Sequence, residues 1–408
     1  MKNKLILFFY FILFLSFTHA VLRVNDHSSF SLYRILMPVS LTILAFGYKK
    51  TMKLVLILVI VLFYNFILTI NYTSDYSKFF IMSAHLFSIL NIYLIISYLY
   101  TKKGFKKIYN LLFYFLVISL IVAFTEQIFN YRLPNTAEYF DGSVSAFNWN
   151  QNELGTIILS FIPLLLVYEM NLIRKYLLVS YILILVYMND SKLVLIGIMI
   201  GIIIYVVKRN IFEKNKILKY FFLGIIFFLI IISIFLPYDE IYVSFRDYDI
   251  SLYTLLGIPI SHIFTLTPFP DIGGSDTTRA NAIIYGITEL INSNFMGIGI
   301  GNSLVMLEKS EYMMISAKSM HNLPVQMVVE NGIVVLLIYL YIFILFIKLL
   351  YKQKITKIEL SILIAIPSIL LGSMGSSIGI FSDYYFFASI FLLITHYNSV
   401  EKRKISAK

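Results

Sequence analysis

"LVLILVIVLFYNFILTI", residues 54–70, contains no charged residue. Its length approaches the roughly 20 apolar residues that a helix needs to cross a bilayer. "YFFLGIIFFLIIISIFL", residues 220–236, has the same character. The whole chain of 408 residues is 59% hydrophobic and 13% charged, whereas a soluble domain carries roughly 25% charged residues. Such a chain must use lipid as its solvent, so the sequence predicts an all-α polytopic membrane protein.

Working outward from these two runs, hydropathy predicts about twelve transmembrane helices in a single integral membrane domain, residues 1–408. The predicted spans are residues 4–21, 31–47, 53–70, 79–100, 109–129, 154–170, 172–188, 192–207, 219–236, 323–350, 358–373 and 379–397. The first 20 residues have the basic start and apolar core of a secretory signal. Because many spans follow, we predict an uncleaved first helix.

The distribution of charge between the loops predicts the orientation of these spans. Alternate loops, such as "YKKTMK" (48–53) and "TKKGFKK" (101–107), hold most of the 33 Lys and Arg, and the opposite loops hold most of the 22 acidic residues. Loops that retain positive charge are cytoplasmic, so we predict an even number of spans with both termini in the cytoplasm. The net charge of +11 is then a sign of topology and of contact with anionic lipid, and nucleic acid is not an expected partner.

Two predicted external loops, residues 130–153 and 237–322, are long enough to carry function. In the larger loop, residues 253–266 read as an interfacial or re-entrant segment. Residues 275–293 predict an amphipathic helix on the outer surface of the bundle, with Asp276 as its N-cap. Its predicted apolar face consists of Ile283, Ile284, Ile287, Leu290 and Ile291.

A polar stripe follows the larger loop in "SAKSMHNLPVQMVVENGIVV" (316–335). Asn322 is a favourable N-cap and Pro324 falls in the first turn, which places His321 just outside the helix at the outer interface. Asn322, Gln326 and Glu330 share one helix face. Polar groups within a membrane are costly, so this face is expected to line the bundle interior or a wet cavity.

The stripe also has two alternative explanations that involve no substrate. His321 can be a solvated interfacial residue, and Glu330 can be a contact between helices. Gly332 follows the stripe and leaves room for a close neighbour or for a ligand.

Cationic groups that could bind phosphate stand in the external segments. Arg279, at the start of the amphipathic helix, offers a rigid guanidinium suited to phosphate, but it can equally pair with Asp276. Lys192, in the short turn after residue 188, can meet a phosphate or pair with Asp190. Arg246 stands in the larger loop.

Other local patterns have simpler explanations. The three glycines of "NFMGIGIGNS" (294–303) lack the strand context of a dinucleotide fingerprint, so they predict a tight backbone turn. The Asp-x-Asp in "RDYDI" (246–250) can hold a divalent cation, but as a three-residue match it is better read as a solvated turn. With no cysteine in the chain, disulfides and thiolate chemistry are excluded, and no metal or cofactor is predicted.

Taken together, four segments resemble those of the O-antigen polymerase and O-antigen ligase superfamily, in the same order. "HNLPVQMVVENG" (321–332) resembles the family's histidine signature, which opens the helix after a large periplasmic loop. The other three are "AFNWNQNELG" (146–155), "NDSKLVLIGI" (189–198) and "TTRANAIIYGITELINSNFMGIGIGNS" (277–303). The resemblance covers roughly residues 146–350, about half of the chain. Two positions depart from the family pattern: Lys192 stands where arginine is usual, and Val335 replaces a glycine.

This resemblance implies a metal-independent membrane glycosyltransferase of the GT-C type in a bacterial cytoplasmic membrane. Such enzymes take a glycan from undecaprenyl pyrophosphate and pass it to an acceptor hydroxyl. We predict a polymerase of lipid-linked repeat units for O-antigen or capsular polysaccharide, which would work with a flippase and a chain-length regulator. The alternatives are a ligase that uses a terminal acceptor and, from another class, a polysaccharide flippase or other transporter.

The predicted site follows from this chemistry. Arg279, Lys192 and Arg246 would stabilise the departing pyrophosphate, and His321 would position or deprotonate the acceptor. Glu330 is the second candidate for the base. The remaining predicted substrate-binding residues are Asn322, Gln326 and Asn152. Aromatic side chains that could stack on sugars are Phe147, Trp149, Tyr248 and Tyr253.

Overall fold

The structure is a computed structural model of the chain. It describes residues 2–18, 21–22, 31–48, 50–134, 143–148, 151–169, 171–189, 191–208, 242–245, 248–251, 275–308, 320, 322–373, 391 and 393–395. The predicted span 219–236, the segment 253–266, His321, Arg246, Asp190, Trp149 and Tyr253 therefore lie outside the described residues, as does most of the predicted span 379–397.

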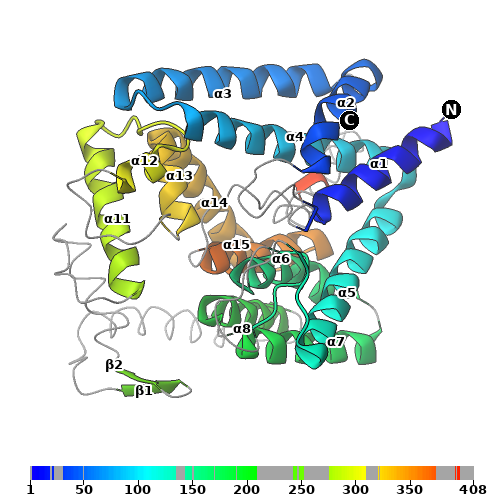
Figure 1. Cartoon of the computed structure of the whole chain (residues 1–408). Coiled ribbons are helices and arrows are strands. Elements are labelled where there is room, and N and C mark those ends of the chain that lie inside the picture. Colours follow the sequence, from blue (N-terminus) through cyan, green and yellow to red (C-terminus); the bar gives the residue numbers. More distant parts are fainter. Residues whose placement is uncertain are drawn as a thin grey trace.

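The described part of the chain is predominantly helical (Figure 1). Its helices are α1 (Lys2–Phe17), α2 (Leu32–Gly47), α3 (Lys50–Tyr72), α4 (Ser77–Lys103), α5 (Phe105–Phe129), α6 (Gln151–Tyr168), α7 (Leu172–Met188), α8 (Lys192–Val206), α11 (Ser275–Asn292), α12 (Asn302–Leu307), α13 (Leu323–Asn331), α14 (Ile333–Tyr351) and α15 (Lys357–Ser373). A short antiparallel hairpin, β1 (Tyr242–Phe245) and β2 (Tyr248–Ser251), pairs Phe245 with Tyr248. The all-α prediction missed this hairpin, which lies in the large loop.

In the part of the chain that the structure describes, four helices are long and apolar enough to cross a membrane by length and composition: Thr51–Tyr72, Ser77–Lys103, Phe105–Phe129 and Ile333–Tyr351. The same part contains four shorter apolar helices, Asn3–Phe17, Leu32–Gly47, Glu153–Tyr168 and Leu193–Val206. The spans Thr51–Tyr72 and Ile333–Tyr351 are each only 11% buried, so most of their apolar side chains face outward, as expected for helices solvated by lipid. These helices indicate an integral membrane protein; the predicted number of twelve spans stays a prediction.

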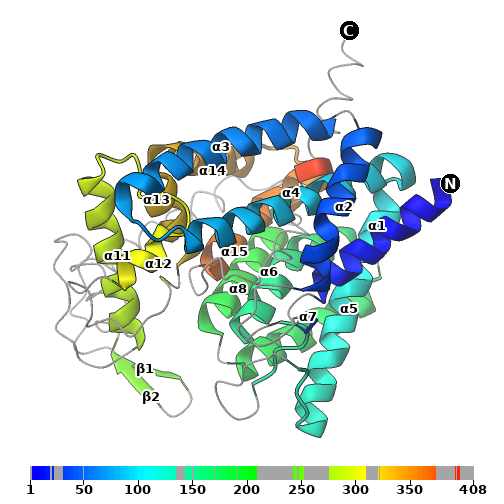
Figure 2. The same cartoon turned by 45° about the horizontal axis from the view of Figure 1, so that its top comes forward.

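The main core is built where α15 packs against α6 and α8 (Figures 1 and 2). Two glycines one turn apart on α8, Gly197 and Gly201, allow this close approach. A Cβ on Gly197 would stand 3.0 Å from both Leu159 Cδ2 and Ser368 O, and one on Gly201 would stand 3.2 Å from Ile364. The Ser368 hydroxyl donates to the Gly197 carbonyl at 3.0 Å. Small residues spaced in this way let apolar helices pack without side chains between them.

Contacts between helix ends group the loops as the charge pattern does. Lys208, after α8, donates to the carbonyls of Leu350 and Lys352 after α14, both at 2.9 Å. These segments belong to the loops that charge assigns to the cytoplasm. On the opposite side, Lys78 at the start of α4 pairs with Glu308 after α12 at 3.6 Å. Both observations agree with the predicted alternation of the loops, which stays a prediction.

The predicted span 323–350 is wrong as a single helix. Gly332 has φ +61°, which breaks the segment into α13 and α14. This left-handed conformation cannot continue an α-helix, and glycine adopts it without the penalty that a Cβ imposes. The apolar span therefore begins at Ile333, and the polar stripe of α13 precedes it rather than entering it.

The helix predicted over residues 275–293 is confirmed as α11. Its predicted apolar face is only partly right, because Ile284 and Leu290 are buried whereas Ile291 is 43% exposed. The face that packs also includes Asn281 and Ala282. The buried face was predicted from the periodicity of bulky apolar residues, whereas α11 approaches α13 through small residues.

Candidate functional site

A loop between α11 and α12, residues 293–301, forms the centre of the candidate site; we call it the glycine loop. Gly297, Gly299 and Gly301 have φ of +91°, +93° and +84°, so the prediction of a tight backbone turn is confirmed. A Cβ on Gly299 would stand 2.5 Å from Thr69 Oγ1 on α3, and one on Gly301 would stand 2.8 Å from the backbone of Lys78 on α4. The glycines serve close backbone packing against the ends of α3 and α4.

Backbone hydrogen bonds join the glycine loop to the end of α13. Ile298 N donates to Val329 O at 3.0 Å, and Gly299 N donates to Glu330 O at 2.9 Å. Ile333 N, in the first turn of α14, donates to Phe295 O at 2.8 Å. The break between α13 and α14 is therefore held by the same loop that it faces.

A buried asparagine on α3 fastens this loop from the other side. Asn65 is 1% exposed; its Oδ1 accepts from Ile300 N at 3.0 Å, and its Nδ2 donates to Asn331 Oδ1 at 3.3 Å. One amide side chain thus connects α3, the glycine loop and α13. A polar group in such an apolar helix is retained only where it finds partners.

The polar stripe of α13 lies inside this assembly. Asn322 caps α13, its Oδ1 accepting from Val325 N at 3.2 Å, as predicted. Gln326 is fully buried and donates through Nε2 to Glu330 Oε1 at 3.1 Å. Ser303, in the first turn of α12, donates through its hydroxyl to the same carboxylate oxygen. Glu330 is 1% exposed, and its burial raises the pKa of the carboxyl, although the bonds from Ser303 and Gln326 oppose this shift.

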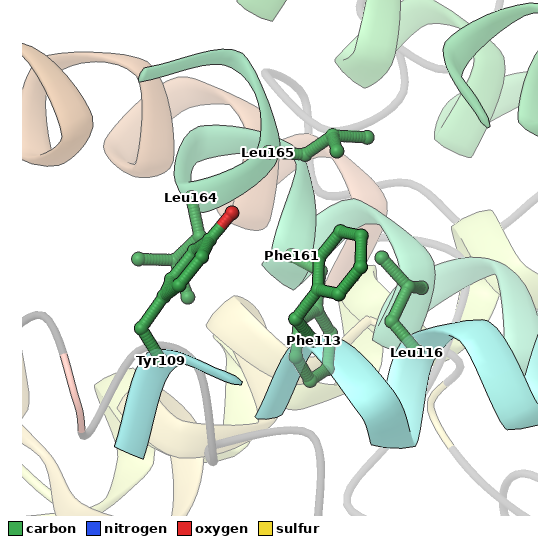
Figure 3. A pocket seen from close by; sticks show the side chains of 6 residues that line it. All are labelled: Tyr109, Phe113, Leu116, Phe161, Leu164 and Leu165. Carbon is green, nitrogen blue, oxygen red and sulfur yellow. The ribbon is translucent and has the colours of Figure 1, made fainter. Parts of the chain in front are cut away.

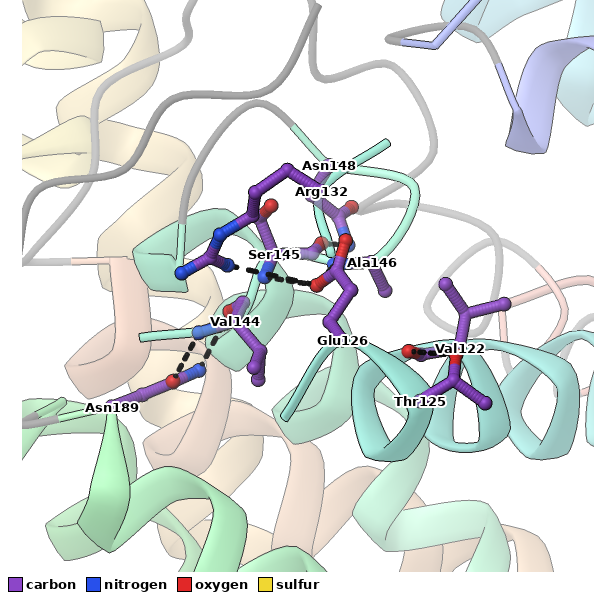
Figure 4. A network of polar contacts seen from close by, with 9 residues as sticks. All are labelled: Val122, Thr125, Glu126, Arg132, Val144, Ser145, Ala146, Asn148 and Asn189. Carbon is purple, nitrogen blue, oxygen red and sulfur yellow. Dashed lines mark hydrogen bonds and ion pairs between the residues drawn. The ribbon is translucent and has the colours of Figure 1, made fainter. Parts of the chain in front are cut away.

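A second polar assembly joins the outer loop after α5 to the turn between α7 and α8 (Figure 4). Glu126 Oε2 accepts from the backbone N–H groups of Ser145 and Ala146 at 2.9 and 2.8 Å. Asn189 brackets Val144, accepting from its N–H at 2.8 Å and donating to its carbonyl at 2.9 Å. The segments "AFNWNQNELG" and "NDSKLVLIGI" therefore lie together. We call Glu126, residues 143–148 and Asn189 the outer-loop network.

Within this network, Glu126 is buried rather than solvated. It is 3% exposed and holds the turn at Ala146, whose φ is +49°. Arg132 lies 3.8 Å from its carboxylate. The carboxylate therefore serves the fold of the loop that leads into α6.

The segment that contains α8 and the glycine loop is similar to a known family. Residues 177–340 match the family model described as O-antigen ligase. This match supports the resemblance of the segment to the O-antigen polymerase and ligase superfamily. The match runs from α7 into α14 and spans fewer than half of the residues. No curated protein matches the chain.

The family segment contains α8, α11, the glycine loop and α13, but not the loop 143–148 or α15. Members of the superfamily are membrane glycosyltransferases or ligases. The resemblance predicted from the sequence is thus confirmed for the region from α7 to α14.

Most, but not all, of the predicted site residues lie in the described part of the chain. Asn322, Gln326 and Glu330 are on α13, as described above. Arg279 lies in α11, Lys192 is the first residue of α8, and Asn152 is in the first turn of α6. His321 and Arg246 lie outside the described residues.

One observation connects the segments that carry Arg279 and His321. A Cβ on Gly286 of α11 would stand 2.6 Å from Met320 Cε and 3.0 Å from Val329 Cγ2 of α13. Met320 is fully buried and directly precedes His321. Arg279 is seven residues before Gly286, and two turns of helix return to the same face over about 10 Å. Arg279 is thus on the face of α11 that meets Met320.

Sequence reasoning missed a buried basic pair between α2 and α4. Arg34 is 9% exposed and His85 is 1% exposed, and Arg34 Nη2 lies 3.0 and 3.1 Å from the two ring nitrogens of His85. Nearby, Asn91 accepts from Ser40 at 2.6 Å. An arginine within the predicted span 31–47 was the available signal, because ionisable residues in spans are costly and usually functional.

A small hollow between α5 and α6 has a different character (Figure 3). It encloses about 190 Å³ of space, part of it open to solvent, and its lining is Tyr109, Phe113, Leu116, Phe161, Leu164 and Leu165. The Tyr109 hydroxyl is its one polar side-chain group. The hollow belongs to the ends of α5 and α6 nearest the loops that charge assigns to the cytoplasm, so we assign it no part in an outer site.

Proposed function

We propose that this protein polymerises undecaprenyl-pyrophosphate-linked oligosaccharide repeat units into O-antigen or capsular polysaccharide at the outer face of the bacterial cytoplasmic membrane. The observation that carries the proposal is the packing of α11 on α13 within the family segment, through Gly286, Met320 and Val329. This packing supports a site in which Arg279 and His321 stand near each other, on a scaffold anchored to α3 and α4.

The chemistry assigns a role to each proposed residue. The acceptor sugar hydroxyl attacks the anomeric carbon of the donor glycan, and the bond from that carbon to the pyrophosphate oxygen breaks. His321 takes the hydroxyl proton. Arg279, Lys192 and Arg246 stabilise the negative charge that develops on the pyrophosphate, so no metal is required. Asn322 and Asn152 bind the sugars.

A membrane site suits this substrate, because its prenyl chain stays in lipid while its glycan extends into water. The large loop 237–322 and the loop 130–153 would enclose the sugars on the outer side. A flippase would deliver the lipid-linked unit to that side, and a chain-length regulator would set the extent of growth.

The second candidate is a ligase that passes the finished glycan to a terminal acceptor, and the match to a family described as O-antigen ligase favours it. The two activities differ in the acceptor alone. Purified protein given only lipid-linked repeats would produce longer lipid-linked chains as a polymerase and none as a ligase.

The residue assignment is tested by His321→Ala and Arg279→Ala, expressed separately in cells that make the polysaccharide and checked for membrane level. Polysaccharide should be reduced to single repeats on its lipid or core, since either change removes a reacting group. Full-length polymer from both variants, at normal levels of protein, would refute the proposed site.

A further inference from the structure

The role of Glu330 follows from where its carboxylate is bound. Among the described residues, its side-chain partners are Ser303 on α12 and Gln326 on α13, and both belong to the protein interior. The residue is 1% exposed and Gln326 is fully buried. A general base must reach the proton that it takes within hydrogen-bond distance or through one water. This carboxylate faces the glycine loop and α12, so neither it nor Gln326 is placed to touch a substrate.

The charges around Glu330 also indicate a structural role for its carboxyl group. Among the described residues, no lysine, arginine or histidine forms an ion pair with it. Lys78, at the start of α4, pairs with Glu308 at 3.6 Å. An ionised carboxylate buried without a cation is costly, whereas a neutral one can accept the bonds from Ser303 and Gln326 without that cost.

Through these bonds Glu330 holds two elements in register. Its side chain fixes the first turn of α12, and its backbone carbonyl accepts from Gly299 N at 2.9 Å. The other end of α13, eight residues earlier, is capped by Asn322 and adjoins His321. A tilt of α13 about its C-terminal end would displace Asn322 relative to α11.

We propose that Glu330, together with Ser303 and Gln326, is a positioning residue of the transferase: it accepts hydrogen bonds as a neutral group and fixes α13 against α12 and the glycine loop. This inference rests on the proposed function and replaces the substrate-binding role predicted for Gln326 and Glu330. Misplacement of a reacting group by about 1 Å can cost about 10²-fold in rate, so a purely geometric role can have a large effect.

The test compares Glu330→Gln, Glu330→Ala and Ser303→Ala in purified full-length protein, with lipid-linked repeats as substrate. Glu330→Gln keeps an oxygen acceptor and the side-chain shape, so it should retain the wild-type rate and the wild-type pH profile. Glu330→Ala should lose about 10²-fold in kcat with a smaller change in KM, and Ser303→Ala should fall between. Glu308→Gln, an exposed carboxylate beside α12, is the matched control and should leave all parameters unchanged.

A second readout does not depend on transferase activity. Hydrogen exchange of the Ile298 and Gly299 amides, which are bonded to α13, should be faster in Glu330→Ala and Ser303→Ala and unchanged in Glu330→Gln. A folded Glu330→Gln as inactive as Glu330→Ala would overturn the proposal, because the carboxylate itself would then be needed. So would unchanged activity and exchange in Ser303→Ala, including the case in which Glu330→Ala fails to fold. Either result leaves the separate test of His321 and Arg279 intact.

Discussion

Gly297 and Gly332 lie back to back, so that a Cβ on Gly297 would stand 2.6 Å from the backbone nitrogen of Gly332. A Cβ on Gly332 would overlap the backbone of Phe295 and Met296. Both residues have positive φ. The contact joins the glycine loop to the break between α13 and α14. Each of the two positions requires glycine, because φ is positive and there is no room for a Cβ.

Gly332→Ala should therefore destabilise the protein by several kcal/mol, beyond the roughly 1–2 kcal/mol that a left-handed conformation alone costs. The backbone of Phe295 and Met296 must move to admit the methyl group. Thermal unfolding in detergent measures the loss.

Two other glycines separate the contributions of conformation and space. Gly104 has φ +76° with nothing within 4 Å of its Cβ position, and Gly47 has open space and no positive φ. Gly104→Ala should cost only the conformational part, and Gly47→Ala should cost little. A Gly332→Ala protein no less stable than Gly104→Ala would contradict the predicted clash.

The second prediction concerns the anchor on α3. Asn65→Leu suits an apolar helix, but it removes the acceptor for Ile300 N–H and the donor to Asn331 Oδ1. Each buried group left unsatisfied costs about 1–3 kcal/mol. We expect faster hydrogen exchange at Ile300 and a lower melting temperature.

Thr125→Ala is its control, because the exposed Thr125 hydroxyl donates to the Val122 carbonyl of its own helix at 2.8 Å and to no other described residue (Figure 4). It should change neither quantity. Equal effects of the two variants would show that Asn65 does not hold the loop.

How far the sequence predicts this site depends on the range of the interactions. The cap at Asn322, the turn at the three glycines and the helix over residues 275–293 were predictable, because each follows from local backbone chemistry. The superfamily was predictable from motifs in their order. The break at Gly332 was not, since the helical pattern runs through it and the cause is a loop more than 30 residues earlier in the chain.

The partners of buried polar residues were equally out of reach. Glu126 and Glu330 look alike in sequence, each a lone acid near a span, but one accepts two backbone N–H groups and the other accepts from two side chains. Asn65 stands in the run that decides the fold, yet its partners at Ile300 and Asn331 belong to distant segments. Tertiary contacts of this kind need the structure.

The third prediction concerns the outer-loop network. Glu126→Ala leaves the N–H groups of Ser145 and Ala146 without an acceptor, at about 1–3 kcal/mol each. Glu126→Gln still offers an oxygen and should cost less. Limited proteolysis of the loop after α5 should be faster in Glu126→Ala than in Glu126→Gln; the reverse order would show that the charge, and its pairing with Arg132, matters more than the acceptor.

The last prediction addresses the core where α8 meets α15. Gly197→Leu inserts a side chain where a Cβ alone would already stand 3.0 Å from Leu159 and from the Ser368 carbonyl. The bond from the Ser368 hydroxyl to the Gly197 carbonyl would break as the helices separate. Overpacking in a close-packed core costs roughly 1–3 kcal/mol or more, and α8 is the element that α15 packs against most extensively among the described helices. Met199→Leu, on the exposed face of the same helix, conserves volume and should be tolerated. The measurement is the fraction of monodisperse protein after extraction in detergent, which should fall for Gly197→Leu alone; full recovery of Gly197→Leu would show that α8 and α15 can separate without loss of the fold.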